Sequence, residues 1–467
     1  MNFCRPKSAD APTRVRRGLR NLPWRLAWAV PLAACWTAVL AVPASAPEAM
    51  TYEEARTALY QVSDARAAAR ADVDRSSDEV KASRLLGFPD LTVGVTELFG
   101  EKTGSITNTP LGNIPYSENF RGPRSSVDST WTIYSGGRIT ATQRALASGV
   151  SAAQADLART ESSLDVLLAR EYFGLELAAN VEATREAVLE QAERQLARAL
   201  RFEQQGLIPR VERLSAAVAR DTAQREQVSA VRDREIAEAS LRRLLHRDQP
   251  VTTGTRLFVL SEPLEPIERW IEWAEARNPE LSALAARHAQ AEQGVRMAEA
   301  SWKPEIFAFG SYALIRKYQT IIEPDWIAGV GVRLTVISHV DRMHQVSAAH
   351  RSLNQATSLE AAASTEIDTR VDSAYRRVAQ AREQFRLLDS SIALAEENLR
   401  LRERGFGEGQ STSLDVSEAR DAVARARTAR AAAAFDFDVA LTQLLEAAGK
   451  TASLPEYIQR SDIRVTP

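Results

Sequence analysis

The chain has 467 residues and a formal net charge of −2, so it is long enough for two or three ordinary domains and slightly acidic. Charged residues make up 26% of the sequence and aromatic residues only 6%, a balance that favours long helices over a compact β-rich core. The acidic charge makes the chain a poor candidate for nucleic-acid binding.

The N-terminal segment, residues 1–44, has the pattern of an export signal. Five arginines between Arg14 and Arg25 precede an apolar run over residues 26–42, and the small residues of the segment PASAP follow it. The run is short for a membrane-spanning helix and is interrupted by Pro31, so we expect it to be cleaved rather than retained as an anchor. Because this segment carries seven basic residues and one acidic residue, its removal changes the net charge from −2 to −8.

Two cleavage sites compete in this segment. Val42 and Ala44 supply the small residues that precede an ordinary cleavage site, which makes Ser45 the first residue of the mature chain. Alternatively, the segment LAAC ending at Cys35 resembles a bacterial lipoprotein signal, in which Cys35 is lipidated. The sequence stays apolar for seven residues after Cys35, which favours the ordinary cleavage. Either cut removes Cys4, so the mature chain cannot form an internal disulfide.

From Thr51 onward the sequence contains two copies of one pattern. Tyr172 and Tyr375 are separated by 203 residues, and the same offset relates Gly206 to Gly409. After the signal peptide we therefore divide the chain into four parts: a first repeat over 45–246, a linker over 247–265, a second repeat over 266–448 and a C-terminal tail over 449–467.

Each copy predicts a helix, two strands, a long helix, a turn and a further helix. The long helix of the first copy covers residues 138–205, which contain no proline and would extend for about 100 Å as one continuous helix. Leucines at steps of seven and four residues place an apolar seam along it, against which a partner helix can pack. The seam consists of Leu157, Leu164, Leu168, Leu175, Leu189, Leu196 and Leu200.

Four segments predict strands: residues 91–99, 126–134, 305–314 and 326–336. Three of them alternate apolar and polar residues, whereas the segment 305–314 is apolar on both faces. Their lengths of about 9–11 residues match strands that cross a bilayer at a tilt, although a half-buried sheet in a soluble domain would show the same alternation. Between Phe99 and Ser125 the first copy has extra residues rich in Gly, Pro, Asn and Thr, and we expect an exposed loop there.

The number of strands limits how they could be placed in a membrane. An open sheet edge in lipid leaves N–H and C=O groups unpaired, and each would cost several kcal/mol. Four strands cannot close into a membrane barrel, because the smallest such barrels have eight. If the strands cross a membrane, the chain must therefore form oligomers. Two chains would give a barrel filled by side chains, and three would give twelve strands around a lumen.

The segment RGFGEGQSTSLDV, residues 404–416, contains three alternating glycines that resemble a phosphate-binding loop. Such a loop follows a strand, whereas this one follows a predicted helix, and the matching segment around Gly206 is also flanked by helices. We therefore expect two turns between antiparallel helices, with glycine in the left-handed conformation. The five histidines lack the spacing of a metal site and no catalytic motif is found, so we expect neither an enzyme nor a cofactor.

These features together resemble the TolC-like outer-membrane factors, the exit ducts of bacterial export machines. The resemblance covers residues 51–448 and is carried by the duplication, the segments YSGGR (134–138) and RFEQQGL (201–207), and the glycine-rich turn. It implies a mainly α-helical, internally duplicated chain that forms a homotrimer. Three chains would build a 12-stranded outer-membrane β-barrel, continuous with a long periplasmic α-helical barrel. The linker and the C-terminal tail would contribute to a band around the helical barrel.

The resemblance also implies a function. The chain would be a passive outer-membrane channel that completes a tripartite export system, with small-molecule efflux preferred. Its partners would be a periplasmic adaptor (a membrane fusion protein), an inner-membrane pump or ABC transporter, and outer-membrane lipid. The outer-membrane component of a type I protein secretion system stays open as an alternative. A periplasmic structural coiled coil or adaptor is the alternative from another class, and strands that cross a membrane argue against it.

The two predicted turns are the candidate docking sites for an adaptor. Gly206 and Leu207 lie at one turn, and Gly409 and Gln410 lie at the other. Small residues at the ends of long hairpins would let another helical hairpin approach the backbone closely. Ser411 occupies a position where related channels often carry an arginine that locks the closed tip, so the sequence leaves open what closes this one.

Acidic residues near the second turn are the candidate entrance to the channel. Asp415 and Glu418 are three residues apart and so share one face of the following helix. By resemblance, a trimer would place them around a narrow opening as a ring of six acids that attracts cations. Phe406 matches a family aromatic that narrows the entrance, and Glu212 is the first-copy counterpart of Asp415. The alternative is that these acids lie on a solvated outer face.

Overall fold

A computed structural model describes residues 49–110, 112–316 and 324–466 of the chain. Both predicted cleavage sites, with Cys4 and Cys35, lie outside these residues. The described α-helices are α1 (Tyr52–Val62), α2 (Asp64–Ser83), α3 (Arg138–Gln204), α4 (Arg210–Leu244), α5 (Ile267–Arg277), α6 (Pro279–Ala300), α7 (Arg342–Gly407), α8 (Ser413–Ala447) and α9 (Leu454–Arg460). The described strands are β1 (Ala49–Met50), β2 (Asp90–Thr109), β3 (Gly112–Tyr134), β4 (Thr252–Thr253), β5 (Phe258–Val259), β6 (Glu305–Ala313), β7 (Trp326–Arg333) and β8 (Ile463–Arg464).

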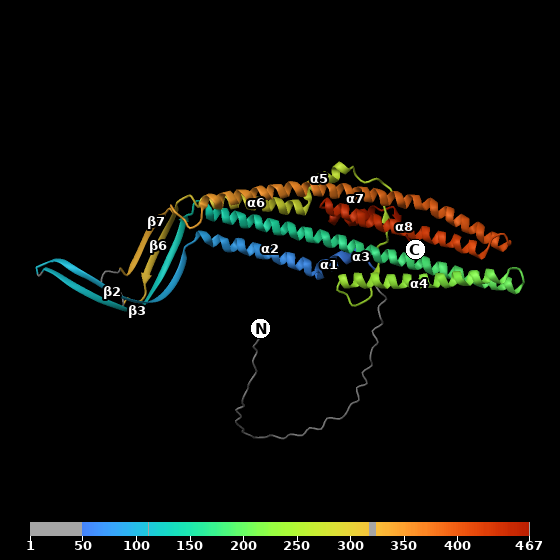
Figure 1. Cartoon of the computed structure of the whole chain (residues 1–467), viewed down its shortest axis with the longest axis horizontal. Helices are drawn as coiled ribbons and strands as arrows, with labels where there is room; N and C mark the ends of the chain where they lie inside the picture. The colour runs from blue at the N-terminus through green and yellow to red at the C-terminus, as the bar shows by residue number, and fades with distance from the viewer. Residues whose placement is uncertain (1–48, 111, 317–323, 467) are drawn as a thin grey trace, which may run out of the picture. The chain divides into compact units, whose positions relative to one another are not determined.

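The order of the elements confirms the duplication. In the first copy α2, β2, β3, α3 and α4 follow one another, and α6, β6, β7, α7 and α8 repeat this order in the second. The helices run side by side, with the sheet at one end and the α3–α4 and α7–α8 turns at the other (Figure 1). α3 packs against α4, α6 and α8, and α7 packs against α6 and α8. The two copies therefore form one helical layer rather than two separate domains.

The two long helices begin at different kinds of cap. α3 has 67 residues and ends within one residue of the prediction, and α7 has 66 residues. α3 begins after Gly137, whose φ of 94° few other residues adopt readily. α7 begins after Asp341, whose side chain accepts the N–H groups of Met343 and His344 at 2.9 and 3.3 Å. Because no proline interrupts either segment, both helices are continuous from the sheet to the turns.

The apolar seam of α3 differs from the prediction near the turn. Leu164, Leu168 and Leu175 are buried as predicted, but Leu200 is 39% exposed. In this last part of α3 the buried residues are instead Val188, Ala192, Gln195 and Ala199. Ala192 packs with alanines of α4 and α8, and these small side chains let the three helices approach closely. The predicted leucine seam is therefore wrong near the turn, where close helix packing selects alanine.

The largest hydrophobic cluster lies where α1, the linker and the C-terminal tail meet the long helices. Its centre is aromatic, with neighbouring ring centres 5.5–6.1 Å apart. The linker and the tail are joined there directly, because β5 pairs with β8, and β1 pairs with β4 of the linker. The rings belong to Tyr52, Tyr172, Phe173, Phe258 and Phe437, all at most 1% exposed.

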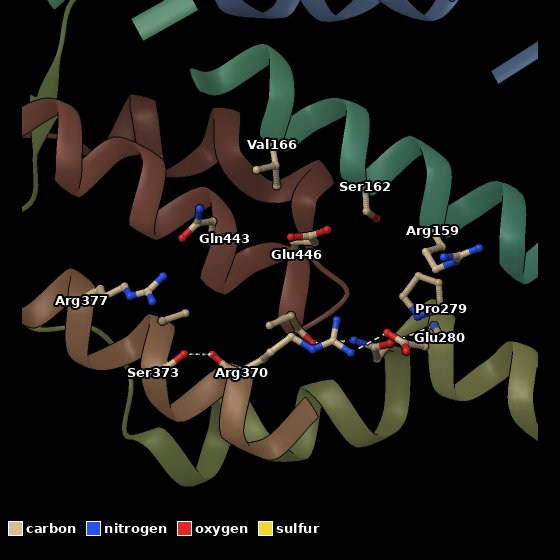
Figure 2. Close-up of a pocket in the computed structure, with 13 residues that line it drawn as sticks. Arg159, Ser162, Val166, Pro279, Glu280, Arg370, Ser373, Arg377, Gln443 and Glu446 are labelled. Atoms are coloured by element: carbon tan, nitrogen blue, oxygen red, sulfur yellow. Dashed lines mark hydrogen bonds and ion pairs between the residues drawn. The ribbon is translucent and has the colours of Figure 1, made fainter. Parts of the chain in front are cut away.

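The N-terminal end of α6 meets the C-terminal end of α8 beside this cluster. Asn278 joins them, since its Nδ2 donates to the carbonyl of Ala447 and its Oδ1 accepts the N–H of Glu280, both at 2.8 Å. Figure 2 shows the cavity at this junction, with charged side chains from α3, α6, α7 and α8 around it. Arg370 of α7 closes one side with an ion pair of 2.6 Å to Glu280. These polar contacts hold the ends of two shorter helices in line.

The four-stranded sheet has the order β2-β3-β6-β7, with every neighbouring pair antiparallel. The loop predicted between Phe99 and Ser125 is wrong. β2 and β3 stay paired through most of that segment and extend beyond β6 and β7 (Figure 1). In this extension β2 is the one partner that β3 has among the described residues, so Pro115 and Pro123 lie where no second described strand needs their missing N–H groups. The prediction read proline and glycine as loop signals, whereas here they mark a sheet edge.

Asp438 of α8 is a carboxyl group enclosed in the hydrophobic cluster. Its Oδ2 accepts the N–H of Phe258 at 3.3 Å, and its Oδ1 has no hydrogen-bond partner among the described residues. Burial raises the pKa of Asp438 well above its ordinary value of 3.8. The folded chain therefore keeps this carboxyl protonated at pH values where an unfolded chain releases the proton.

Replacing Asp438 with Asn should make stability less dependent on pH. Because the folded pKa is raised, the native chain loses stability as pH rises above about 4, by up to about 1.4 kcal/mol per pH unit until the folded pKa is reached. Asn cannot ionise, so the variant should gain on the native protein between pH 5 and pH 8. Denaturant midpoints at the two pH values measure this. Asp233→Asn, at an exposed position of α4, is the control and should change little; equal pH dependence of native and D438N proteins would contradict the prediction.

Candidate functional site at the sheet and the hairpin turns

One face of the sheet is apolar and exposed. The register of the strands places residues from all four on this face, and several are more than two-thirds exposed: Val95 is 70% exposed, Val330 71% and Val332 70%. A soluble surface rarely carries so many adjacent large apolar side chains, so this face requires apolar surroundings. Its exposed members are Leu91, Val93, Val95, Phe99, Trp131, Tyr312, Trp326, Val330 and Val332.

The opposite face of the sheet is mostly small and polar. It carries Thr92 and Gly94 of β2, Asp128 and Thr130 of β3, and Gly329 of β7. The sheet is also open, because β2 and β7 are edge strands for which the described residues supply no second partner. This arrangement fits a sheet with lipid on one side, water on the other and further strands at both edges. In the part of the chain that the structure describes, no helix combines the length and the apolar character needed to cross a membrane.

The two glycine turns lie at the other end of the long helices. Gly206 has a φ of 73° and Gly409 a φ of 76°, in the left-handed region that follows a helix C-terminus. The next residue closes each turn: Leu207 N–H donates to the carbonyl of Phe202 at 2.8 Å, and Gln410 N–H donates to that of Gly405 at 2.7 Å. The predicted helix–turn–helix is therefore confirmed at both positions. A Cβ added at either glycine would have open space around it, so the turns are free surfaces in the single chain.

Asp415 is part of the N-terminal cap of α8. Its carboxylate accepts the N–H of Thr412 at 2.9 Å and the hydroxyl of Thr412 at 2.8 Å, and the Thr412 hydroxyl accepts the N–H of Asp415 at 3.1 Å. Arg402 of α7 lies 3.4 Å from the other carboxylate oxygen. The backbone N–H of Thr412 lowers the pKa of Asp415, which therefore stays ionised at neutral pH. Asp415 carries a negative charge at the turn while it stabilises the start of α8.

Glu212 occupies the equivalent position in α4 but binds a different group. The cap residue of α4 is Pro209, which has no N–H for a carboxylate at the third helical position to accept. The Glu212 side chain instead accepts the N–H of Ser413 in α8 at 2.7 Å. The structure thus brings Glu212 and Asp415 together at the first turn of α8, where negative charge is favourable. Pro209 indicates in the sequence that Glu212 cannot cap its own helix, but not that the group it binds lies in the other hairpin.

Phe406 and Glu418 differ in exposure. Phe406 is 3% exposed and stacks on Phe202 of α3, with ring centres 6.1 Å apart, so it packs the two hairpins together within one chain. Glu418 is exposed, and none of the described residues forms an ion pair with it. Ser411 packs against α7, because a Cβ at Gly405 would lie 2.6 Å from its Oγ. The roles of these residues at a channel entrance stay predictions.

Comparison with protein families matches residues 63–246 and 270–450, more than half of the chain, to the description "outer membrane efflux protein". The chain belongs to the outer membrane efflux protein family. The match falls in two segments, as the duplicated order of elements requires. Members of this family are passive outer-membrane channels, so the chain is not an enzyme, as predicted. No curated protein matches the sequence.

Solved structures of outer-membrane proteins share the fold. The Campylobacter jejuni CmeC outer membrane channel aligns with a TM-score of 0.71 and 14% identity over 88% of this chain and 90% of that one. The outer membrane protein VceC from Vibrio cholerae aligns with 0.70 and 14% over 85% and 96%. The open state of the Neisseria gonorrhoeae MtrE outer membrane channel aligns with 0.69 and 18% over 86% and 89%. At these identities the similarity concerns the fold.

Replacing Glu212 with Ala should expose the N–H of Ser413. Loss of one hydrogen bond of about 1–1.5 kcal/mol would speed exchange of this amide by about tenfold. Hydrogen exchange of a peptide covering residues 411–416 measures the change. Glu418→Ala serves as the control, because it removes a charge from α8, the helix of Ser413, without removing a hydrogen bond. Unchanged protection in the Glu212 variant would show that the contact does not hold the start of α8.

Proposed function

We propose that three copies of this chain assemble into the outer-membrane exit duct of a tripartite export system that carries small molecules. The observation that supports this most directly is the open four-stranded sheet, which has an exposed apolar face and two unpaired edges. Membership of the outer membrane efflux protein family agrees with it. The sheet would lie in the outer membrane, and the helices would project into the periplasm.

Three copies satisfy the sheet better than other small numbers. One copy leaves the N–H and C=O groups of β2 and β7 unpaired in lipid, where each costs several kcal/mol. Two copies would give eight strands, whose interior is filled by side chains. Three copies give twelve strands and leave a lumen, which the small, polar face of the sheet would line. Threonines and glycines on that face are consistent with contact with water.

The solubilised protein should therefore be a trimer. Light scattering with the detergent contribution subtracted should give three times the mass of the mature chain, because the edge strands find partners only in other copies. The trimer should also migrate differently in gels before and after heating. A monomeric mass would refute the assembly and with it the duct.

The hairpin turns would form the periplasmic entrance and meet the adaptor. Gly206, Leu207, Gly409 and Gln410 are exposed at the turns, and the two glycines have no side chain to hinder a partner. The partner would be a hairpin of a periplasmic adaptor, itself bound to an inner-membrane pump or ABC transporter. Bulky residues at both glycines would test this contact, since they should abolish export while trimers still reach the outer membrane; export that survives would place docking elsewhere.

The acids beside the second turn would select cations at this entrance. Asp415 is ionised and Glu418 is exposed, so three copies would supply six carboxylates. Glu212 is engaged by Ser413 and would contribute by fixing α8 rather than by facing the opening. Phe406 would support the ring from beneath by packing against Phe202.

Replacing Asp415 and Glu418 together with Ala should weaken cation selectivity. Single-channel recording in planar bilayers should show a lower preference for cations and weaker block by trivalent cations from the periplasmic side, because the ring of charge is lost. Glu366→Ala is a matched control, since Glu366 is an exposed carboxylate in the middle of α7, away from the turns. Selectivity and block equal to those of the native channel would show that these acids are not at the constriction.

A further inference from the structure

The small, polar face of the sheet carries two large aromatic rings. Phe307 and Phe309 are two residues apart in β6, so both side chains lie on the face that carries Thr130 and Ser311 rather than on the apolar face. Their ring centres are 6.2 Å apart. Contact with lipid does not explain them, because the residues suited to lipid are on the other side.

Two glycines of the neighbouring strand give the rings their place. Phe307 pairs with Gly331 and Phe309 with Gly329 across the β6–β7 ladder. A Cβ at Gly331 would lie 2.6 Å from the ring of Phe307, and one at Gly329 would lie 3.0 Å from the ring of Phe309. The rings therefore lie across the backbone of β7 instead of standing away from the sheet. Phe309 presents its other side to the space in front of the sheet and is 38% exposed, whereas Phe307 is half-buried.

Arg333 adds a positive charge to the same surface. Its guanidinium carbon lies 4.6 Å from the centre of the Phe307 ring, in a cation–π contact. Its cross-strand neighbour Glu305 is 3.5 Å from Arg138 instead. Among the described residues no carboxylate lies within ion-pair distance of Arg333, whose side chain is exposed. The exposed ring of Phe309 thus lies beside the Phe307 ring and a guanidinium that has no ion-pair partner among the described residues.

We propose that Phe307, Phe309 and Arg333 form a transient site for planar aromatic anions, such as aromatic carboxylates or sulfonates, as they pass through the channel. The inference rests on the proposed function, because this face lines a lumen only when the sheet closes with other copies. An aromatic cargo molecule would stack on the exposed ring of Phe309, and its negative group would face Arg333. A closed trimer would carry three such sites at one level of the barrel.

The chemistry of the site suits passage rather than retention. Ring stacking and an exposed ion pair are each weak interactions, so a bound molecule would leave quickly. Conduction requires such weak sites, since a tight site would block the channel. The hydroxyl-bearing residues around the rings, Thr130 among them, offer no comparable attraction to an aromatic molecule, so the rings would distinguish this cargo from other anions.

Single-channel recording on the assembled protein tests the site with three probes. Naphthalene-2-sulfonate, added like the other two probes from the outer side so that it reaches the sheet without crossing the ring of acids, should interrupt the current of the native channel. Methanesulfonate has the same charge without a ring and should not, and N-methylquinolinium has a ring with the opposite charge and should block less. Replacing both Phe307 and Phe309 with Leu keeps their apolar volume and should weaken the naphthalenesulfonate block by about tenfold. Arg333→Gln should weaken it by about threefold.

The controls separate this inference from the proposed function. Thr96→Ser, on the same face of β2, should leave the block unchanged. If the Leu variant conducts and is blocked like the native channel, the aromatic site is wrong and the duct stands. If the native protein forms no channel, both proposals fail. If Arg333→Gln leaves the block unchanged, the preference for anions is wrong. Should the double variant not assemble, Phe309→Leu alone tests the site, because it alters the more exposed ring. It should weaken the naphthalenesulfonate block by about threefold.

Discussion

The unpaired edges of the sheet are the constraint on which the rest of the structure depends. The outer edges of β2 and β7 have no partner strand in the part of the chain that the structure describes, and the sheet between them has one strongly apolar face. Water could satisfy the edges but not the apolar face, and lipid could satisfy the face but not the edges. In the proposed trimer, strands from further copies pair with these edges while lipid covers the apolar face. The long helices that continue from the strands would then lie beside those of the other copies.

Each copy of the duplicated pattern contributes two strands and one helical hairpin, yet equivalent residues of the two hairpins make different contacts. Pro209 precedes α4 and Thr412 precedes α8, each just after a turn. The difference between these two cap residues decides which N–H group the carboxylate three residues later accepts. Thr412 engages Asp415 in its own cap, whereas Pro209 has no N–H to offer and leaves Glu212 for α8. One substitution at a cap thereby converts a contact within a hairpin into a contact between hairpins. Asymmetry of this kind lets two similar hairpins recognise each other in a fixed order.

Local features could be predicted from the sequence and non-local ones could not. α3 begins and ends close to its predicted bounds, and the glycine turns were found, because helix continuation and left-handed glycine depend on neighbours in the chain. The extended β2–β3 hairpin could not be predicted, because proline indicates a loop unless it lies at the edge of a sheet. The sequence does not reveal which strands have such an edge. The seam near the turn was placed on leucines, although close packing with α4 and α8 selects alanines such as Ala192. The Glu212–Ser413 contact needed the relative position of two hairpins, which no spacing reveals.

Three buried carboxylates of the longer helices bind α1 and the linker at the central cluster. Asp165 of α3 accepts a bidentate pair from Arg56 of α1 at 2.7 and 2.8 Å, Glu176 of α3 binds Arg256 of the linker at 2.9 Å, and Asp438 of α8 accepts a linker N–H. Removing the partner of a buried charge destabilises a folded chain by about 3–5 kcal/mol, so loss of Arg56 or Arg256 would be strongly destabilising. The neutral Asp438 imposes no such penalty, which makes its contact the weakest of the three. The β5 strand beside it is held instead by burial, because Leu257, Phe258, Val259 and Leu260 are each at most 5% exposed.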